Sequence, residues 1–253
     1  MAWAEVLHPD VWRADQLAAP PTPCAPTGWA ALDAMLPGGG WPLGALVEWV
    51  VPAHTLPWRL LQPALQTATQ QGLLALIGLP LEPQLAVWAA HGIDPSRLVR
   101  VQPHDDAQGC WAAEQALACP QVTLCWLHLH QPSVAALRRL HQAAARARCD
   151  ATQPGAWPAP LVLCSVPEAT ALSATPAPLR LQLQGSTADG VTIRVRKRRG
   201  PPLPGPVHIA AALPWAAWVR VAPAHARSRL RQRLTAVQPA AACPQAPTAA
   251  PPG

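Results

Sequence analysis

The sequence contains no phenylalanine and no tyrosine, so tryptophan, with 12 copies, must supply all the large aromatic bulk of a core. Charged residues make up only 13% of the chain and apolar residues 50%, a composition that can bury a sizeable core. No apolar run is long enough to span a membrane, and no basic segment followed by an apolar one marks a secretory signal near residue 1. These absences predict a globular protein of the cytoplasm.

Lysine occurs only once, as Lys197. The phosphate-binding Walker A loop, G-x-x-x-x-G-K-[ST], requires a lysine directly after a glycine. Lys197 follows Arg196, so the sequence contains no such loop in any alignment. The net charge of +6 is carried almost wholly by arginine and weakly favours an acidic partner, either nucleic acid or protein.

The 7 cysteines are odd in number and form no C-x-x-C pair, which is typical of reduced cytoplasmic thiols. A metal site is also not indicated, because the cysteines and histidines between residues 119 and 141 lack the closely spaced ligand pairs of zinc sites. We interpret them as buried thiols and polar strand-end histidines; they are Cys119, Cys125, His128, His130 and His141.

Residues 27–58 organise the rest of the chain. A short amphipathic segment leads to the glycine-rich turn at 37–40, and the apolar, β-prone run at 45–51 predicts a buried strand of a parallel sheet. A helical period follows at 57–71. The connection between strand and helix stands where a P-loop would lie, but it has no glycine, and its two prolines lack N–H groups that could bind phosphate. Its sequence is Val51, Pro52, Ala53, His54, Thr55, Leu56, Pro57 and Trp58.

Two patterns in this stretch, T-G-x-x-x-L-D at 27–33 and G-G-G-x-P-x-G at 38–44, closely resemble the start of the RecA-type ATPase core. With LHPDVWRADQLA at 7–18 and RVRKRRGPPLPGP at 194–206, the chain resembles the ImuA proteins of bacterial damage-induced mutagenesis, sometimes labelled SulA-like. The resemblance covers roughly residues 7–220.

From residue 45 onward the pattern alternates between strand and helix. Together with period-two runs at 179–184 and 191–196, which predict a hairpin through 185–190, this indicates an α/β fold. We expect a RecA-like three-layer core with a mostly parallel sheet and closing antiparallel strands. Further strands are predicted at 73–79, 98–101, 122–129, 161–166 and 207–210, and further helices at 82–91, 110–119 and 132–147.

Three regions are predicted along the chain. Residues 1–26 form an N-terminal arm and connector, and residues 27–222 form the RecA-like core without an intact P-loop. Residues 223–253 are first basic and then rich in alanine and proline, a composition that predicts a disordered tail.

The resemblance implies that the nucleotide site is lost. The position of the Walker B aspartate, which would hold Mg²⁺, corresponds to Trp126, and that of the catalytic glutamate corresponds to Pro80. Glu82 would at best be a displaced substitute, and Arg59 is an alternative phosphate-binding cation. We therefore expect no catalytic residue, no cofactor and no metal, and a vestigial P-loop at Val51, Pro52, His54, Pro57 and Trp58.

Two arginine-rich patches are candidate contacts for DNA or an acidic partner. The alternative for the first patch is a solvated strand edge, and for the second a flexible arm that only adds solubility. The first consists of Arg194, Arg196, Lys197, Arg198 and Arg199, and the second of Arg227, Arg229, Arg231 and Arg233.

The resemblance implies a non-catalytic accessory protein of damage-induced translesion DNA synthesis. Such a protein would act with an ImuB-like relative of Y-family polymerases and an error-prone C-family polymerase, and would contact RecA or DNA. It would be cytoplasmic and associated with the nucleoid when DNA is damaged. The alternatives are a SulA-type inhibitor that binds the tubulin-like division protein and an ATPase that uses unorthodox residues.

Overall fold

A computed structural model describes residues 22–187 and 189–210 of the chain. They belong to the first of two units into which the chain divides, Met1–Ala211 and Ala212–Gly253. The predicted tail and most of the predicted N-terminal arm lie outside the described residues.

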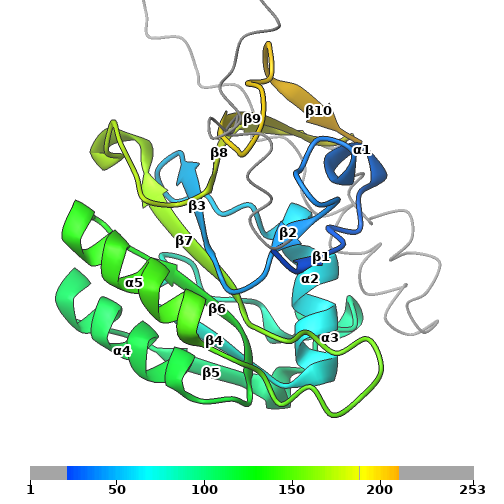
Figure 1. Cartoon of the computed structure of the whole chain (residues 1–253), viewed down its shortest axis with the longest axis vertical. Coiled ribbons are helices and arrows are strands. Elements are labelled where there is room, and N and C mark those ends of the chain that lie inside the picture. Colours follow the sequence, from blue (N-terminus) through cyan, green and yellow to red (C-terminus); the bar gives the residue numbers. More distant parts are fainter. Residues whose placement is uncertain (1–21, 188, 211–253) are drawn as a thin grey trace, which may run out of the picture. The chain divides into compact units, whose positions relative to one another are not determined.

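Strands and helices alternate along the middle of the chain, as the sequence predicts (Figure 1). The strands are β1 (Cys24–Ala25), β2 (Trp41–Pro42), β3 (Leu46–Val51), β4 (Leu73–Ile77), β5 (Leu98–Val101), β6 (Val122–His128), β7 (Leu161–Pro167), β8 (Leu179–Ser186), β9 (Val191–Lys197) and β10 (Val207–Ile209). The α-helices are α1 (Ala30–Asp33), α2 (Trp58–Gln71), α3 (Leu85–Ala90), α4 (Asp106–Ala118) and α5 (Val134–Arg146), and two 3₁₀ turns lie at Pro95–Arg97 and Glu168–Thr170.

Eight strands form one sheet in the order β10-β9-β8-β3-β7-β6-β4-β5. The six strands from β8 to β5 are parallel, whereas β9 and β10 are antiparallel and close the sheet beyond β8. The predicted α/β fold with a mostly parallel sheet and closing antiparallel strands is therefore confirmed. All six residues of β3 are buried, as expected of a mostly apolar strand between two neighbouring strands.

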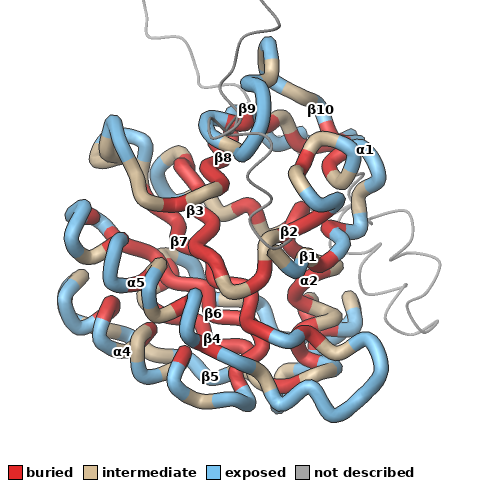
Figure 2. Tube along the Cα trace, in the orientation of Figure 1, coloured by how far each residue is buried: buried red, intermediate tan, exposed pale blue. Residues whose placement is uncertain are grey.

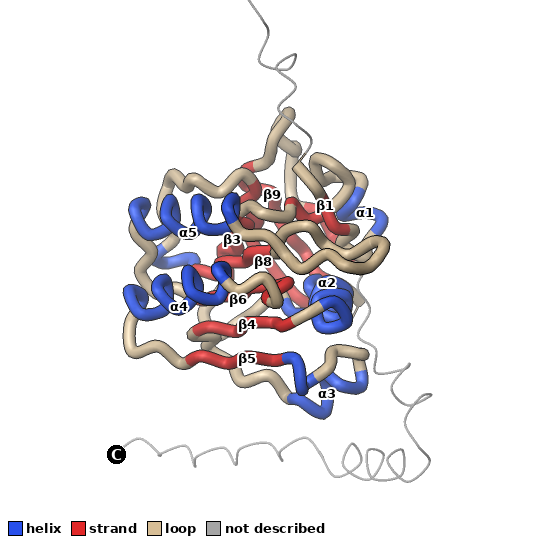
Figure 3. Tube along the Cα trace, turned by 60° about the horizontal axis from the view of Figure 1, so that its bottom comes forward, coloured by secondary structure: helices blue, strands red, loops and turns tan. Residues whose placement is uncertain are grey.

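Helices cover both faces of the sheet and complete three layers (Figure 3). Alternate residues of β3 point to opposite faces, so Trp49 and Val51 pack with α2 while Leu46 and Val50 pack with α4 and α5. Figure 2 shows the strands buried in the interior, whereas α4 and α5 expose their outer faces. The buried residues of α2 recur at helical spacing and form one largely apolar face, which packs against the sheet.

Some elements of the described chain differ from the prediction, and helix α3, predicted from residue 82, begins at Leu85. Helix α4 begins at Asp106 rather than at residue 110, because the Asp105 side chain accepts a hydrogen bond from the Gln108 N–H at 2.8 Å and caps the helix. In addition, β1 and β2 form a small antiparallel pair that the sequence does not predict. A Cβ at Gly40 would lie 2.1 Å from the Ala25 carbonyl oxygen, so glycine permits the close approach.

Candidate functional site

The loop predicted to be a vestigial P-loop lies at the carboxyl edge of the sheet, where the parallel strands end. Its backbone passes from Val51, the last residue of β3, to Trp58, the first residue of α2. Pro52 and Pro57 contribute no N–H groups, and Pro57 stands directly before the first residue of α2. Within this loop His54 takes a left-handed conformation with φ of 54°, which is uncommon for a residue with a side chain.

Apolar side chains fill the space around this loop. Leu56 and Trp58 pack against the core, and the Trp58 ring meets the His91 ring edge-on at 5.8 Å between centroids. Both residues line two small hollows of about 200 Å³ and 170 Å³, one toward α3 and one toward the β8–β9 hairpin. Leu81 lines both hollows and is 46% exposed. The edge therefore presents a largely apolar surface where a P-loop would present amides.

Arg59, the alternative phosphate-binding cation, is directed toward the β8–β9 hairpin. Its Nη1 donates hydrogen bonds to Ser186 Oγ at 3.0 Å and to the Thr187 carbonyl oxygen at 2.6 Å. The residue is buried, and burial lowers the pKa of its guanidinium. These contacts tie the start of α2 to the hairpin.

The positions implied for the acidic ATPase residues carry other groups. Trp126 is fully buried in β6, and its Nε1 donates to Ser165 Oγ at 2.8 Å. Glu82 is paired with Arg100 and its side chain is 77% exposed. Trp126 therefore lies where the resemblance implies an aspartate, and Glu82 is an exposed ion-pair partner.

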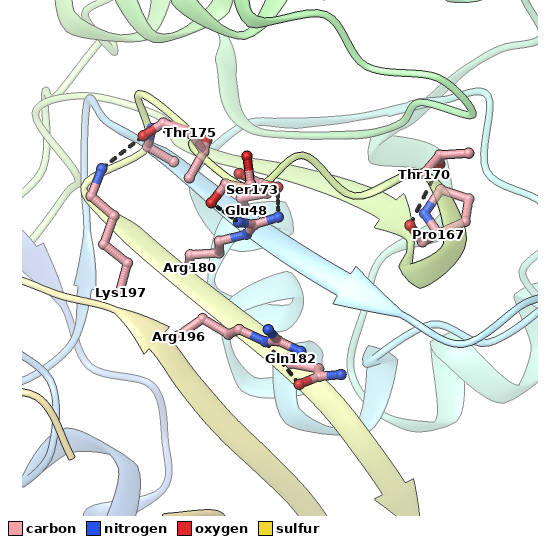
Figure 4. Close-up of polar contacts among 10 residues, drawn as sticks. Glu48, Pro167, Thr170, Ser173, Thr175, Arg180, Gln182, Arg196 and Lys197 are labelled. Atoms are coloured by element: carbon pink, nitrogen blue, oxygen red, sulfur yellow. Dashed lines mark hydrogen bonds and ion pairs between the residues drawn. The ribbon is translucent and has the colours of Figure 1, made fainter. Parts of the chain in front are cut away.

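The basic strand β9 has the alternation that its sequence predicts, with Arg194 and Arg196 exposed on one face. Figure 4 shows that Arg196 meets Gln182 of β8 and that Lys197 meets Thr175. Arg196 Nε donates to Gln182 Oε1 at 2.9 Å, and Lys197 Nζ donates to the Thr175 carbonyl oxygen at 2.7 Å. No described residue forms a hydrogen bond or an ion pair with the exposed Arg194 side chain, so the N–H donors of its guanidinium are available to a ligand.

The two arginines after β9 contact the beginning of the described chain. Arg198 donates to the carbonyl oxygens of Pro201, at 2.9 Å, and of Met35, and Arg199 Nη1 donates to Thr22 Oγ1 at 3.2 Å. Some N–H donors of both guanidinium groups are therefore already used in hydrogen bonds within the protein. The second predicted patch, Arg227, Arg229, Arg231 and Arg233, lies outside the described residues.

The loop between β3 and α2 and the end of the basic strand β9 lie at opposite edges of the sheet. Because β9 is antiparallel to β8, Lys197 pairs with Arg180 near the beginning of β8, at the amino edge of the parallel strands. Both edges carry charges of both signs. Exposed charged residues near the carboxyl edge include Glu82, Arg100, Asp105 and Glu168, and those near the amino edge include Asp94, Arg97, Asp150 and Arg199.

One buried ion pair was not predicted. Glu48 of β3 and Arg180 of β8 are register partners, and Glu48 Oε1 lies 3.1 Å from Arg180 Nη2 (Figure 4). Their side chains are 0% and 8% exposed. The sequence offers one signal for this pair, namely the single carboxylate of Glu48 inside an otherwise apolar strand, because a buried charge needs a partner.

The residues weighed as metal ligands do not form a ligand set. Within residues 22–187 and 189–210, no group of three or more His, Cys, Asp and Glu side chains could hold a metal ion. The His128 and His130 rings meet edge-on at 5.0 Å between centroids, and burial lowers the pKa of His128 to about 4. Burial raises the pKa of the Cys125 thiol to about 12, which keeps it protonated.

A scan of the sequence against protein-family models finds no match, and a search of curated proteins finds none either. Among the described residues, no helix has the length and apolar character needed to cross a membrane.

Proposed function

We propose that the chain is a non-catalytic accessory protein of damage-induced translesion DNA synthesis, as its resemblance to the ImuA proteins implies. The observation that carries this proposal is the loop between β3 and α2. A RecA-like sheet is retained, yet Pro52, Pro57 and Trp58 stand where a P-loop needs N–H groups, a lysine and a hydroxyl. A core of this kind is suited to binding other macromolecules rather than to phosphoryl transfer.

The exposed cations of β9 support a role beside nucleic acid. Arg194 and Arg196 extend from one face of the strand, and sequence-independent phosphate contacts require accessible positive charge of this kind. In the proposed role the protein binds an ImuB-like polymerase relative and an error-prone C-family polymerase, and contacts RecA or DNA. We further propose that it is a cytoplasmic protein that associates with the nucleoid after DNA damage.

Two measurements test the proposal. Calorimetric titration with millimolar ATP and Mg²⁺ is expected to give no saturable heat, since the loop lacks the lysine and hydroxyl that hold phosphate and metal. A Mg²⁺-dependent site of micromolar affinity would refute the non-catalytic role. Deletion of the gene is expected to abolish damage-induced mutation. If overproduction instead blocks cell division while induced mutation persists in the deletion strain, the protein is a SulA-type division inhibitor.

The contribution of β9 is tested with Arg194→Ala, and Arg97→Ala serves as a control because it removes an exposed arginine from a different element. For one lost phosphate contact on single-stranded DNA, the slope of log affinity against log salt should flatten by about 0.7. Arg97→Ala should leave the slope unchanged. If Arg194→Ala changes neither DNA affinity nor induced mutation, β9 is a solvated edge rather than a contact surface.

A further inference from the structure

A cavity of about 440 Å³ opens at the amino edge of the sheet. It lies between the β1–β2 pair, the beginnings of β3 and β8, and α5. Most of its wall is apolar, formed by prolines, glycines, alanines and Leu179, while its polar lining comes from Thr22, Cys24, His141 and Arg199. No acidic side chain of the described residues lines it. The volume is within the range of pockets that bind small molecules or the side chains of a peptide.

The polar groups of this cavity are mainly hydrogen-bond donors. His141 Nδ1 accepts a hydrogen bond from the Leu46 N–H at 3.3 Å, so a neutral imidazole carries its proton on Nε2. Burial, with the charges of Lys197 and Arg199, lowers the pKa of His141 and favours that neutral form. Arg199 donates to Thr22 Oγ1 through Nη1, and a guanidinium has five N–H donors in all. The cavity therefore favours an anionic group.

Two kinds of macromolecule could supply that anion, and the lining favours one of them. Proteins that bind single-stranded nucleic acid stack bases on aromatic rings. Among the residues that the structure describes, no tryptophan lines this cavity, and nearby Trp41 is fully buried. A carboxylate can instead take two parallel hydrogen bonds from a guanidinium, while the apolar wall receives an aliphatic side chain.

We propose that this cavity binds an acidic segment of a partner protein, with a carboxylate on Arg199 and a neighbouring aliphatic side chain in the apolar interior. The inference goes beyond the proposed function, because it requires neither DNA contact by β9 nor a particular partner. Failure of the cavity to bind acidic peptide would leave the proposed function standing, and failure of that function would leave the cavity intact.

The test measures fluorescence anisotropy of a fluorescein-labelled peptide, Ala-Leu-Asp-Leu-Asp-Ala, titrated with the full chain. We expect saturable binding that weakens roughly tenfold or more when both aspartates of the peptide are replaced by asparagine, because charge-assisted hydrogen bonds are about twice as strong as neutral ones. A peptide with serine in place of leucine should also bind more weakly. Absence of saturable binding, or equal binding of the asparagine peptide, would overturn the proposal.

Variants of the protein locate the binding. Arg199→Gln removes the charge, and Ala145→Leu fills the cavity from an exposed position of α5 without altering the core. Each should weaken peptide binding roughly tenfold while the melting temperature stays near that of the parent. Arg194→Gln removes an arginine that does not line the cavity and should bind the peptide normally. The proposal is wrong if both cavity variants bind like the parent, or if Arg199→Gln impairs binding of oligothymidylate but not of the peptide.

Discussion

The ion pair between Glu48 and Arg180 allows a sharp test of how the core tolerates charge. The two side chains are 0% and 8% exposed, and their closest charged atoms lie 3.1 Å apart. Replacing Glu48 with leucine leaves the Arg180 guanidinium of β8 buried, with one hydrogen bond to the described residues, 3.4 Å long, to the Ser173 carbonyl oxygen. Removing one member of a buried pair typically costs about 3 to 5 kcal/mol of unfolding free energy.

The reverse change, Arg180→Met, leaves the Glu48 carboxylate buried without its counter-ion and should cost a similar amount. The double variant Glu48→Leu with Arg180→Met removes both charges, so it should lie within about 2 kcal/mol of the parent. The sum of the unfolding free energies lost in the two single variants would then greatly exceed the unfolding free energy lost in the double variant. Urea unfolding followed by tryptophan fluorescence measures the unfolding free energy of all four proteins, because buried tryptophans such as Trp49 of β3 become exposed to solvent on unfolding.

An exposed pair provides the matched control. Glu114 and Arg139 are 3.0 Å apart, but their side chains are 30% and 61% exposed. The same double-mutant cycle on this pair should give a coupling energy below about 1 kcal/mol. The interpretation that each buried charge needs its partner would be refuted by two outcomes. In one, the losses of unfolding free energy for the Glu48 and Arg180 variants are additive; in the other, a single variant lies within about 1 kcal/mol of the parent.

Two further outcomes are expected. Because the pKa of His128 falls from 6.5 unfolded to about 4 folded, the unfolded state binds more protons between these values, so stability present above pH 6.5 is lost as the pH falls. Solvent screening limits the effect, so the parent should lose on the order of 1 kcal/mol of unfolding free energy between about pH 6.5 and pH 5 because of His128. In urea titrations, the His128→Asn variant should not show this loss, whereas a variant of an exposed histidine, His104→Asn, should lose as much as the parent. Gly40→Ala places a Cβ 2.1 Å from the Ala25 carbonyl oxygen and should lower the melting temperature more than Gly39→Ala, whose Cβ meets nothing within 4 Å but whose φ of 73° disfavours alanine. Equal melting temperatures for the two alanine variants would contradict the close packing of β1 on β2.

The main strands were predictable because their signal is local. Residues 98–101 form β5 with the expected bounds, and the continuous apolar runs of β3 and β6 identify strands buried on both faces. The pair β1–β2 was missed because each strand has only two residues, too few to show a period, and because the pairing depends on contacts between distant segments. The predicted start of α4 is too late because the prediction does not include the capping signal of Asp105, whose side chain accepts a hydrogen bond from the Gln108 N–H.

The candidate site was predicted residue by residue but not in its arrangement. The sequence identifies the proline-bearing loop and the cations of β9, yet no local pattern relates one to the other. Their places at opposite edges follow from the antiparallel direction of β9 beside β8, which only the assembled sheet reveals. The cavity beside Arg199 was likewise missed, because it joins residues 22, 141 and 199 from three separate segments.

Several residues of the carboxyl edge are held by packing or hydrogen bonds within the protein. Trp58 packs its ring against the core and His91, so a hydroxyl at this position would leave a gap rather than a metal ligand. Arg59 ties α2 to the hairpin, and Trp126 fills the interior beside Ser165 where an aspartate would be buried without a counter-charge. A lysine at position 57 alone would therefore not create a nucleotide site, because the surrounding residues stabilise the edge as a packed surface.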